Sequence, residues 1–281
     1  MREEQTIWVT PLTINMRAKK SLGQNFLKSK AVLADIILAS ELKSSDTVLE
    51  IGPGKGVLTE ALLGTGAKVV AVEKDDRLIP LLQEKFAKEI SGGKLKLIHG
   101  DALEIDNWKL DINDYKVVAN IPYYITGQIF RKFLTAQNKP ELVVLMVQKE
   151  VAQRIVARNG KESLLSLSIK VYGVPKIIRI VSKTYFKPRP KVDSAILKIQ
   201  NISKQFFSGK AAKKEGERNF FELIKLGFSS KRKILLGNLK KVDWKGKKTT
   251  KDVFQICGIN EKARAEDLSL GEWKCLLEKA T

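Results

Sequence analysis

The fold is decided by residues 47–56, which read TVLEIGPGKG. The first five residues form a short β-branched and apolar run, which is typical of a buried strand. Glycine then occurs at every second position, where a chain that leaves a strand and opens a helix needs backbone without side chains. Because such a turn lets main-chain N–H groups approach a ligand closely, we expect the start of an α/β fold with a ligand-binding loop.

Short β-branched runs alternate with segments of helical period from residue 31 to about 170, the pattern of βαβ units on a mostly parallel sheet. The predicted strands are 47–51, 68–73, 94–99, 116–119 and 142–147, and the predicted helices are 31–42, 57–63, 77–89, 128–136 and 149–157. Two further strands, 177–186 and 194–199, flank a Lys-Pro-Arg-Pro turn. We expect them to form an antiparallel hairpin at the end of the sheet.

The pattern changes after Gln200 to polar, lysine-rich helices separated by glycines. We therefore expect an N-terminal extension over 1–18, an α/β domain over 19–203 and a small helical domain over 204–281. The chain carries 51 basic and 31 acidic residues, a net charge of +20, and residues 201–251 alone hold 13 Lys and 2 Arg against 4 acids. This localised surplus predicts a nucleic acid partner; a solvated surface kept soluble by charge repulsion is the alternative.

Composition disfavours several classes of protein. His99 is the sole histidine, and Cys257 and Cys275 are the only cysteines, so histidine-dependent nucleophilic catalysis, a zinc site and a disulfide framework are not expected. No apolar run approaches the ~20 residues that span a bilayer, and the first 20 residues lack the apolar core of a signal peptide. We expect a metal-free cytoplasmic protein, and the absence of heptads favours a monomer.

Acidic residues follow two strands at the edge of the sheet that carries the glycine loop. Glu73 ends the second predicted strand and could accept both hydroxyls of a ribose; Asp101 follows the third and could accept from an adenine amino group. Each acid alone could equally be a turn former.

A nicotinamide-dependent oxidoreductase would use the same ribose acid, but its loop reads G-x-G-x-x-G, whereas the spacing from Gly52 is G-x-G-x-G with Glu50 just ahead.

The tetrapeptide Asn120-Ile121-Pro122-Tyr123 follows the fourth predicted strand and indicates the reaction. The N6 amine of adenine is a poor nucleophile because its lone pair is delocalised into the ring. The Asn120 side-chain oxygen and the Ile121 carbonyl could accept its two protons and aim the lone pair at a sulfonium methyl group, while Tyr123 stacks on the base. The base must then be flipped out or unpaired, as in an RNA loop. Taken alone, the tetrapeptide is also compatible with a turn and a core tyrosine.

Five stretches of the sequence together resemble the small-subunit ribosomal RNA adenine dimethyltransferase family. They are residues 19–27 (KKSLGQNFL), 50–56 (EIGPGKG), 120–123 (NIPY), 188–195 (PRPKVDSA) and 264–269 (RAEDLS). The resemblance implies a Rossmann-like, S-adenosylmethionine-dependent methyltransferase sheet followed by a small helical RNA-binding domain. It also implies that the enzyme dimethylates N6 of two adjacent adenosines in a hairpin loop near the 3′ end of the small-subunit (16S) RNA during ribosome biogenesis.

The resemblance assigns roles to individual residues. It implies cofactor contacts from Asn25, Leu27, Gly52, Glu73, Asp101 and Asn120, and we expect a further contact from Gly54 of the glycine loop. It places Phe186 on the face of the target base opposite Tyr123, although Phe186 would equally suit the core of a strand. We expect RNA contacts from Arg154, Lys187 and Arg189 and from the cluster Lys231-Arg232-Lys233.

Two relatives of this family remain as alternatives. The large-subunit RNA methyltransferases that confer macrolide resistance share the same core, and a ribosome-assembly factor could keep the fold as a platform without catalysis. The segment from Arg264 to Leu268, followed by an amphipathic stretch from Trp273 to Leu277, resembles the small-subunit branch. An intact cofactor motif weighs against a purely structural role.

Overall fold

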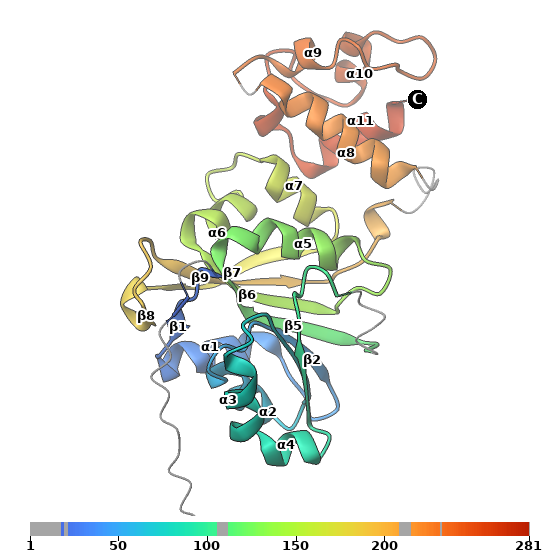
Figure 1. The fold of residues 1–281 in the computed structure, drawn as a ribbon. Coiled ribbons are helices and arrows are strands. Elements are labelled where there is room, and N and C mark those ends of the chain that lie inside the picture. The colour runs from blue at the N-terminus through green and yellow to red at the C-terminus, as the bar shows by residue number, and fades with distance from the viewer. Residues whose placement is uncertain (1–17, 20–21, 106–111, 208–214, 231, 281) are drawn as a thin grey trace, which may run out of the picture.

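The computed structural model describes residues 18–19, 22–105, 112–207, 215–230 and 232–280. A seven-stranded sheet has helices on both faces, and a group of C-terminal helices lies beyond one of these helical layers (Figure 1). Within the described ranges, no helix is long and apolar enough to cross a membrane.

The order of the strands places a ligand site near the middle of the sheet. The strands, in the order β4-β3-β2-β5-β6-β9-β7, are β4 (Leu95–His99), β3 (Lys68–Glu73), β2 (Thr47–Ile51), β5 (Tyr115–Asn120), β6 (Leu142–Gln148), β9 (Ser194–Gln200) and β7 (Val174–Val181). Strands β2 to β6 are parallel, and β9 pairs antiparallel with β6 and β7, which confirms the predicted fold class. The order reverses between β2 and β5, and ligands of such sheets bind at the carboxyl ends of the strands at this reversal.

Helices cover both faces of the sheet, because successive side chains of each buried strand point to opposite faces and both sets are apolar. Helices α1 (Lys30–Ser40), α2 (Val57–Leu63), α3 (Leu78–Lys85) and α4 (Ala87–Ser91) lie below the sheet in Figure 1, and α5 (Thr126–Thr135), α6 (Lys149–Ile155) and α7 (Leu164–Lys170) lie above it. On β5, Val117 and Ala119 enter the apolar cluster of the upper layer, whereas Val118 enters the cluster of the lower layer.

Two predicted elements differ from the structure. The helix predicted over 77–89 is interrupted at Phe86, a buried residue with φ −113° that separates α3 from α4. The strand predicted over 177–186 is wrong beyond Val181, because the Ser182 hydroxyl caps a 3₁₀ turn over Lys183–Tyr185. The next residues form β8 (Phe186–Lys187), which pairs with β1 (Phe26–Leu27) in a separate two-stranded sheet. The predicted antiparallel pairing of the last two strands of the main sheet is confirmed.

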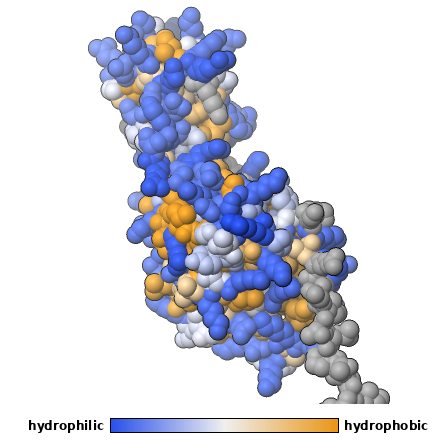
Figure 2. All heavy atoms as spheres, turned by 90° about the vertical axis from the view of Figure 1, so that its left-hand side faces the viewer, coloured by the Kyte–Doolittle hydropathy of each residue, from blue (hydrophilic) through white to orange (hydrophobic). Residues whose placement is uncertain are grey.

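The C-terminal helices share the apolar core of the upper layer. They are α8 (Gly216–Gly227), α9 (Leu235–Asn238), α10 (Thr250–Ile256) and α11 (Leu270–Lys279), with further 3₁₀ turns at Gln205–Phe207, Phe228–Ser230 and Ala265–Asp267. One cluster of buried side chains runs from the sheet into these helices, where Phe220, Phe254 and Trp273 are fully buried. The outer surface that Figure 2 shows over these helices is mostly hydrophilic.

The two cysteines are paired, contrary to our expectation. Cys257 follows α10 and Cys275 lies on α11, and the packing of these helices brings their Cα atoms within 5.8 Å, where a disulfide joins them. The two residues are 18 positions apart, and their spacing in the sequence does not reveal that the two helices meet.

Candidate active site

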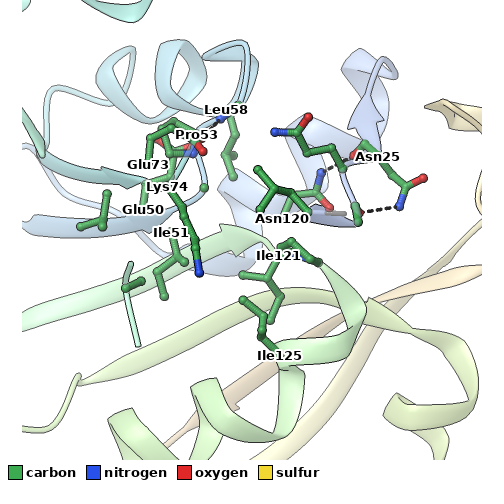
Figure 3. A pocket seen from close by; sticks show the side chains of 18 of the residues that line it. Asn25, Glu50, Ile51, Pro53, Leu58, Glu73, Lys74, Asn120, Ile121 and Ile125 are labelled. Carbon is green, nitrogen blue, oxygen red and sulfur yellow. Dashed lines mark hydrogen bonds between the residues drawn. The ribbon is translucent and has the colours of Figure 1, made fainter. Parts of the chain in front are cut away.

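A pocket lies at the reversal of the sheet, where the loops after β2, β3, β4 and β5 meet the N-terminal loop 22–27 (Figure 3). The structure brings the residues predicted from separate motifs around this pocket: Asn25, Leu27, Gly52, Gly54, Glu73, Asp101, Asn120, Ile121 and Tyr123. They come together because the carboxyl ends of parallel strands meet at the same edge of a sheet.

The glycine loop after β2 requires glycine for both its backbone conformation and its space. Gly52, Gly54 and Gly56 have φ values of +68°, +62° and +73°, in the left-handed region that L-residues rarely adopt. A Cβ atom on Gly54 would lie 3.1 Å from Cε1 of Phe26, and one on Gly56 would lie 2.5 Å from Cε2 of Phe86. The loop can therefore approach β1 and α3 only without side chains.

Glu73 connects the end of β3 to the glycine loop. Its Oε2 accepts a hydrogen bond from the Gly54 amide at 2.9 Å, and its Oε1 accepts one from the Asp75 amide at 2.8 Å. Burial raises the pKa of Glu73, against the lowering effect of these two donors. Each carboxylate oxygen keeps further acceptor capacity, which suits the hydroxyl pair of a ribose.

Asp101 is held by Lys74, a residue that belongs to none of the motifs described above. Lys74 directly follows Glu73, and its Nζ lies 2.6 Å from Asp101 Oδ2, while the Leu103 amide donates to Oδ1 at 2.9 Å. Burial alone would raise the pKa of Asp101, but these donors outweigh it and the pKa lies below its ordinary value. The ionised carboxylate is a suitable acceptor for an exocyclic amino group.

Glu50 is the most unusual group of the pocket. It is 1% exposed, and neither carboxyl oxygen has a hydrogen-bond partner among the described residues. Burial raises its pKa to about 8, the nearby Glu73 adds to the rise, and the charge of Lys85 opposes it. A buried unpaired carboxyl is costly unless a ligand provides donors. Because Glu50 lines the pocket, it fits a ligand with an ammonium group, such as the amino-acid part of S-adenosylmethionine.

Asn120 ends β5 with its amide group held in one orientation. Its Nδ2 donates to the Asn25 carbonyl oxygen at 3.2 Å (Figure 3), so the carboxamide oxygen is the end left to accept from a ligand. The next residue, Ile121, is 2% exposed, and among the described residues no hydrogen bond ends on its carbonyl oxygen. Asn120 and Ile121 both line the pocket, and each carries an oxygen that is free to accept a hydrogen bond from a ligand.

The two aromatic residues predicted for the target base are placed differently. Tyr123 lines the pocket, and its hydroxyl lies 2.6 Å from Oγ of Ser194, a buried residue of β9, so the far end of the ring is fixed. Burial raises the pKa of Tyr123. Phe186 is 4% exposed and packs in the lower apolar cluster with Leu27 and Val181, outside the set of residues that line the pocket.

The sequence matches the ribosomal RNA adenine dimethylase family over residues 15–281. The chain belongs to this family. A ribosomal RNA small subunit methyltransferase A of Dehalococcoides mccartyi is 43% identical over 263 residues, which cover 93% of this chain and 88% of the relative. One of Clostridium botulinum is 41% identical over 258 residues, 90% of each chain. The predicted resemblance is confirmed, and with it the class of enzyme, an S-adenosylmethionine-dependent ribosomal RNA adenine dimethyltransferase.

Solved structures show the same fold over nearly the whole chain. A dimethyladenosine transferase from Plasmodium falciparum superposes with a TM-score of 0.75 at 30% identity, covering 90% of this chain and 96% of that one. The 23S rRNA methyltransferase ErmE superposes with a TM-score of 0.73 at 25% identity, covering 90% and 98%. This chain therefore shares its fold with a dimethyladenosine transferase and with a 23S rRNA methyltransferase.

The basic residues predicted to contact RNA lie on separate elements of this dimethylase. Arg154 is exposed in the last turn of α6, Lys187 is exposed on β8, and Arg189 is exposed in the following loop. Arg232 and Lys233 are exposed ahead of α9, and Lys231 lies outside the described residues. Within the described residues, no group of three or more His, Cys, Asp or Glu side chains could hold a metal ion.

Proposed function

We propose that this chain transfers methyl groups from S-adenosylmethionine to the N6 amines of two adjacent adenosines in a hairpin loop near the 3′ end of small-subunit ribosomal RNA. The proposal rests chiefly on the two acceptors of Asn120 and Ile121 at the end of β5, on the same pocket as Glu73 and Asp101. Family membership and identities of 41% and 43% to small-subunit enzymes support this choice of RNA.

The residues of the pocket divide into groups that hold the cofactor and groups that act on the base. S-adenosylmethionine supplies an electrophilic methyl group. Glu73 would accept the ribose hydroxyls, Asp101 the adenine amino group and Glu50 the ammonium group, while Gly52 and Gly54 leave room for close approach. All of these contacts would place the cofactor on the β2–β4 side of the reversal.

The target base would enter on the β5 side. The Asn120 carboxamide oxygen and the Ile121 carbonyl oxygen accept the two N–H protons of N6 and draw the nitrogen toward tetrahedral geometry. The Tyr123 ring, held by Ser194, stacks on the base and keeps it out of the RNA loop. The surplus proton leaves to solvent or through Asn120.

The remaining surface would bind the RNA. We propose that residues 204–281 form an RNA-binding domain, and that Arg154, Lys187, Arg189 and the triplet 231–233 contact phosphates. The protein would act on the immature small subunit, as a monomer and in the cytoplasm.

One assay separates the proposed activity from its alternatives. Purified protein is given radiolabelled S-adenosylmethionine with undermethylated small subunits, with naked small-subunit RNA and with large-subunit RNA, and nicotinamide cofactor binding is measured in parallel. We expect dimethyladenosine in the small-subunit RNA alone. Label in large-subunit RNA would favour the activity of ErmE, the more distant of the two solved relatives at 25% identity. Binding of the cofactor without transfer of label to any RNA would indicate an assembly factor that does not catalyse methylation.

A further inference from the structure

Tyr124 is a large aromatic side chain that the proposed chemistry does not use. It is 62% exposed, yet it lines the pocket beside Tyr123. Burial of an aromatic ring is ordinarily favourable, so an exposed ring at the opening of a nucleotide pocket is a candidate contact for a base.

The local backbone explains why two adjacent tyrosines have different environments. Tyr123–Ile125 is a 3₁₀ helix, in which successive side chains point about 120° apart because there are three residues per turn. The Tyr123 hydroxyl reaches inward to the buried Ser194 of β9, so Tyr124 is directed to a different side. The helix is fixed in turn by the Thr126 hydroxyl, which donates to the Tyr123 carbonyl at 2.9 Å.

The ring of Tyr124 is supported from the N-terminal loop. Gly23 has φ +60°, and a Cβ atom at this position would lie 3.2 Å from Cε1 and 3.3 Å from Cδ1 of Tyr124. A side chain there would push against the ring, so glycine lets the loop backbone lie against Tyr124. The ring is therefore held on one side by the loop while most of its surface stays accessible.

We propose that Tyr124 is the stacking platform for the nucleotide next to the adenosine that is being methylated. The inference rests on the proposed function, in which two adjacent adenosines are modified in turn. When one of them enters the pocket, its neighbour loses a stacking partner and lies at the opening, where an accessible aromatic ring can replace it. Stacking on aromatic side chains is the usual way in which proteins bind unpaired RNA bases.

The two adenosines would exchange places between Tyr123 and Tyr124. Each base would occupy the inner tyrosine while its nitrogen is methylated and the outer tyrosine while the other is methylated. The two rings cannot replace each other. The Tyr123 hydroxyl is hydrogen-bonded to Ser194, and this contact prevents the Tyr123 ring from turning toward the opening of the pocket.

The test combines a change in the protein with a change in the RNA. Small subunits are reassembled with RNA that carries either both adenosines or one adenosine beside an abasic nucleotide, and kcat/KM is measured for wild type, Tyr124→Ala, Tyr124→Leu and Tyr124→Phe. For wild type we expect the abasic neighbour to lower kcat/KM by roughly 5- to 150-fold, the range for one stacked base. Tyr124→Ala should lower kcat/KM by a similar factor on intact RNA and by nothing further on abasic RNA.

The conservative variants separate stacking from bulk. Tyr124→Phe keeps the ring and should respond to the abasic neighbour as wild type does, whereas Tyr124→Leu keeps apolar bulk without the ring and should resemble Tyr124→Ala. Cofactor affinity should be the same in all four proteins. The proposal is wrong if Tyr124→Leu equals wild type, if the two reductions multiply, or if Tyr124→Ala weakens cofactor binding to the same extent. A wild-type protein that cannot methylate intact subunits would instead contradict the proposed function.

Discussion

The pocket at the carboxyl edge of the sheet and the C-terminal helices differ in how their polar groups are arranged. In the pocket, three polar groups are each fixed by a short-range contact: Glu73 by the Gly54 amide, Asp101 by Lys74 and Asn120 by the Asn25 carbonyl. The C-terminal region instead has an apolar interior around Trp273 and a surface rich in lysine. Single atoms therefore matter in the pocket, whereas charge in the C-terminal region is spread over many side chains.

This difference predicts how each region responds to substitution. A fixed acceptor in the pocket has one position, so its removal should lower kcat by about 100-fold or more without changing the fold. An exposed lysine is one of many, so its removal should change RNA affinity gradually and in a salt-dependent way. The interior of the C-terminal region should respond only to changes of volume.

Asn120→Ala should have the largest effect. Loss of the carboxamide oxygen removes one of the two acceptors for the N6 protons, and removing one positioned group of this kind typically costs about 100-fold or more in kcat. The cofactor contacts of Glu73 and Asp101 are unchanged, so cofactor affinity should stay close to that of wild type. The measurement is single-turnover methyl transfer to small subunits beside a cofactor titration. Unchanged turnover would show that Asn120 does not have the proposed catalytic role.

The residues of the pocket could be predicted from the sequence because parallel strands end at a common edge. Glu73, Asp101 and Asn120 each follow a β-branched run, and this position alone places them together. The Lys74 ion pair could not be predicted, because it depends on the distance between two loops. The sequence places Tyr124 beside Tyr123, but the exposure of its side chain depends on the 3₁₀ turn.

Contacts between elements far apart in the sequence were the main features that the sequence did not reveal. The pairing of Leu27 with Phe186 joins the N-terminal loop to β8, and no local pattern encodes it. The disulfide of Cys257 and Cys275 depends in the same way on the packing of α10 against α11. The break at Phe86 is also tertiary, because this residue turns into the apolar cluster of α1–α4 instead of continuing a helix.

Glu50→Gln should change the pH dependence of stability. The folded-state pKa of Glu50 is raised to about 8, so between its ordinary value of 4.5 and about 8 the folded protein holds a proton that the unfolded chain releases. Rising pH through this window should therefore destabilise wild type, by up to roughly 1.4 kcal/mol per pH unit. Urea unfolding at pH 5.5 and 7.5 without cofactor should show that the advantage of wild type over the variant falls as pH rises. A constant difference would show that Glu50 does not titrate in this window.

Two glycines of the C-terminal helices form a matched pair for the volume argument. A Cβ on Gly227 of α8 would overlap the Trp273 ring and lie 3.0 Å from Cδ1 of Leu235, whereas a Cβ on Gly237 of α9 has no atom within 4 Å. Gly227→Ala should therefore destabilise the protein by about 1–3 kcal/mol. Gly237→Ala should be neutral or stabilise it by up to about 1 kcal/mol, because alanine lowers the entropy of the unfolded chain. Denaturant unfolding followed by tryptophan fluorescence measures both, and equal effects would contradict a closely packed interior around Trp273.

The smallest effect is expected from the basic triplet. Replacing Lys231, Arg232 and Lys233 by Gln removes three charges from a chain of net charge +20, so catalysis at saturating RNA should be unchanged. RNA binding should weaken, and the slope of log K against log salt should become shallower by about 0.7 for each phosphate of single-stranded RNA that the variant no longer neutralises. Binding is measured between low and physiological salt.

The control variant removes the same number of positive charges from a different part of the surface. Lys43, Lys88 and Lys94 are exposed near the α1–α4 layer, on the opposite side of the sheet from the C-terminal helices, and their replacement by Gln also removes three charges. If RNA is attracted only by total charge, the two triple variants should weaken RNA binding equally. If the triplet makes direct phosphate contacts, only its variant should change the salt slope, because only released counterions contribute to that slope. The comparison therefore distinguishes a general attraction from a defined RNA-binding surface on the C-terminal helices.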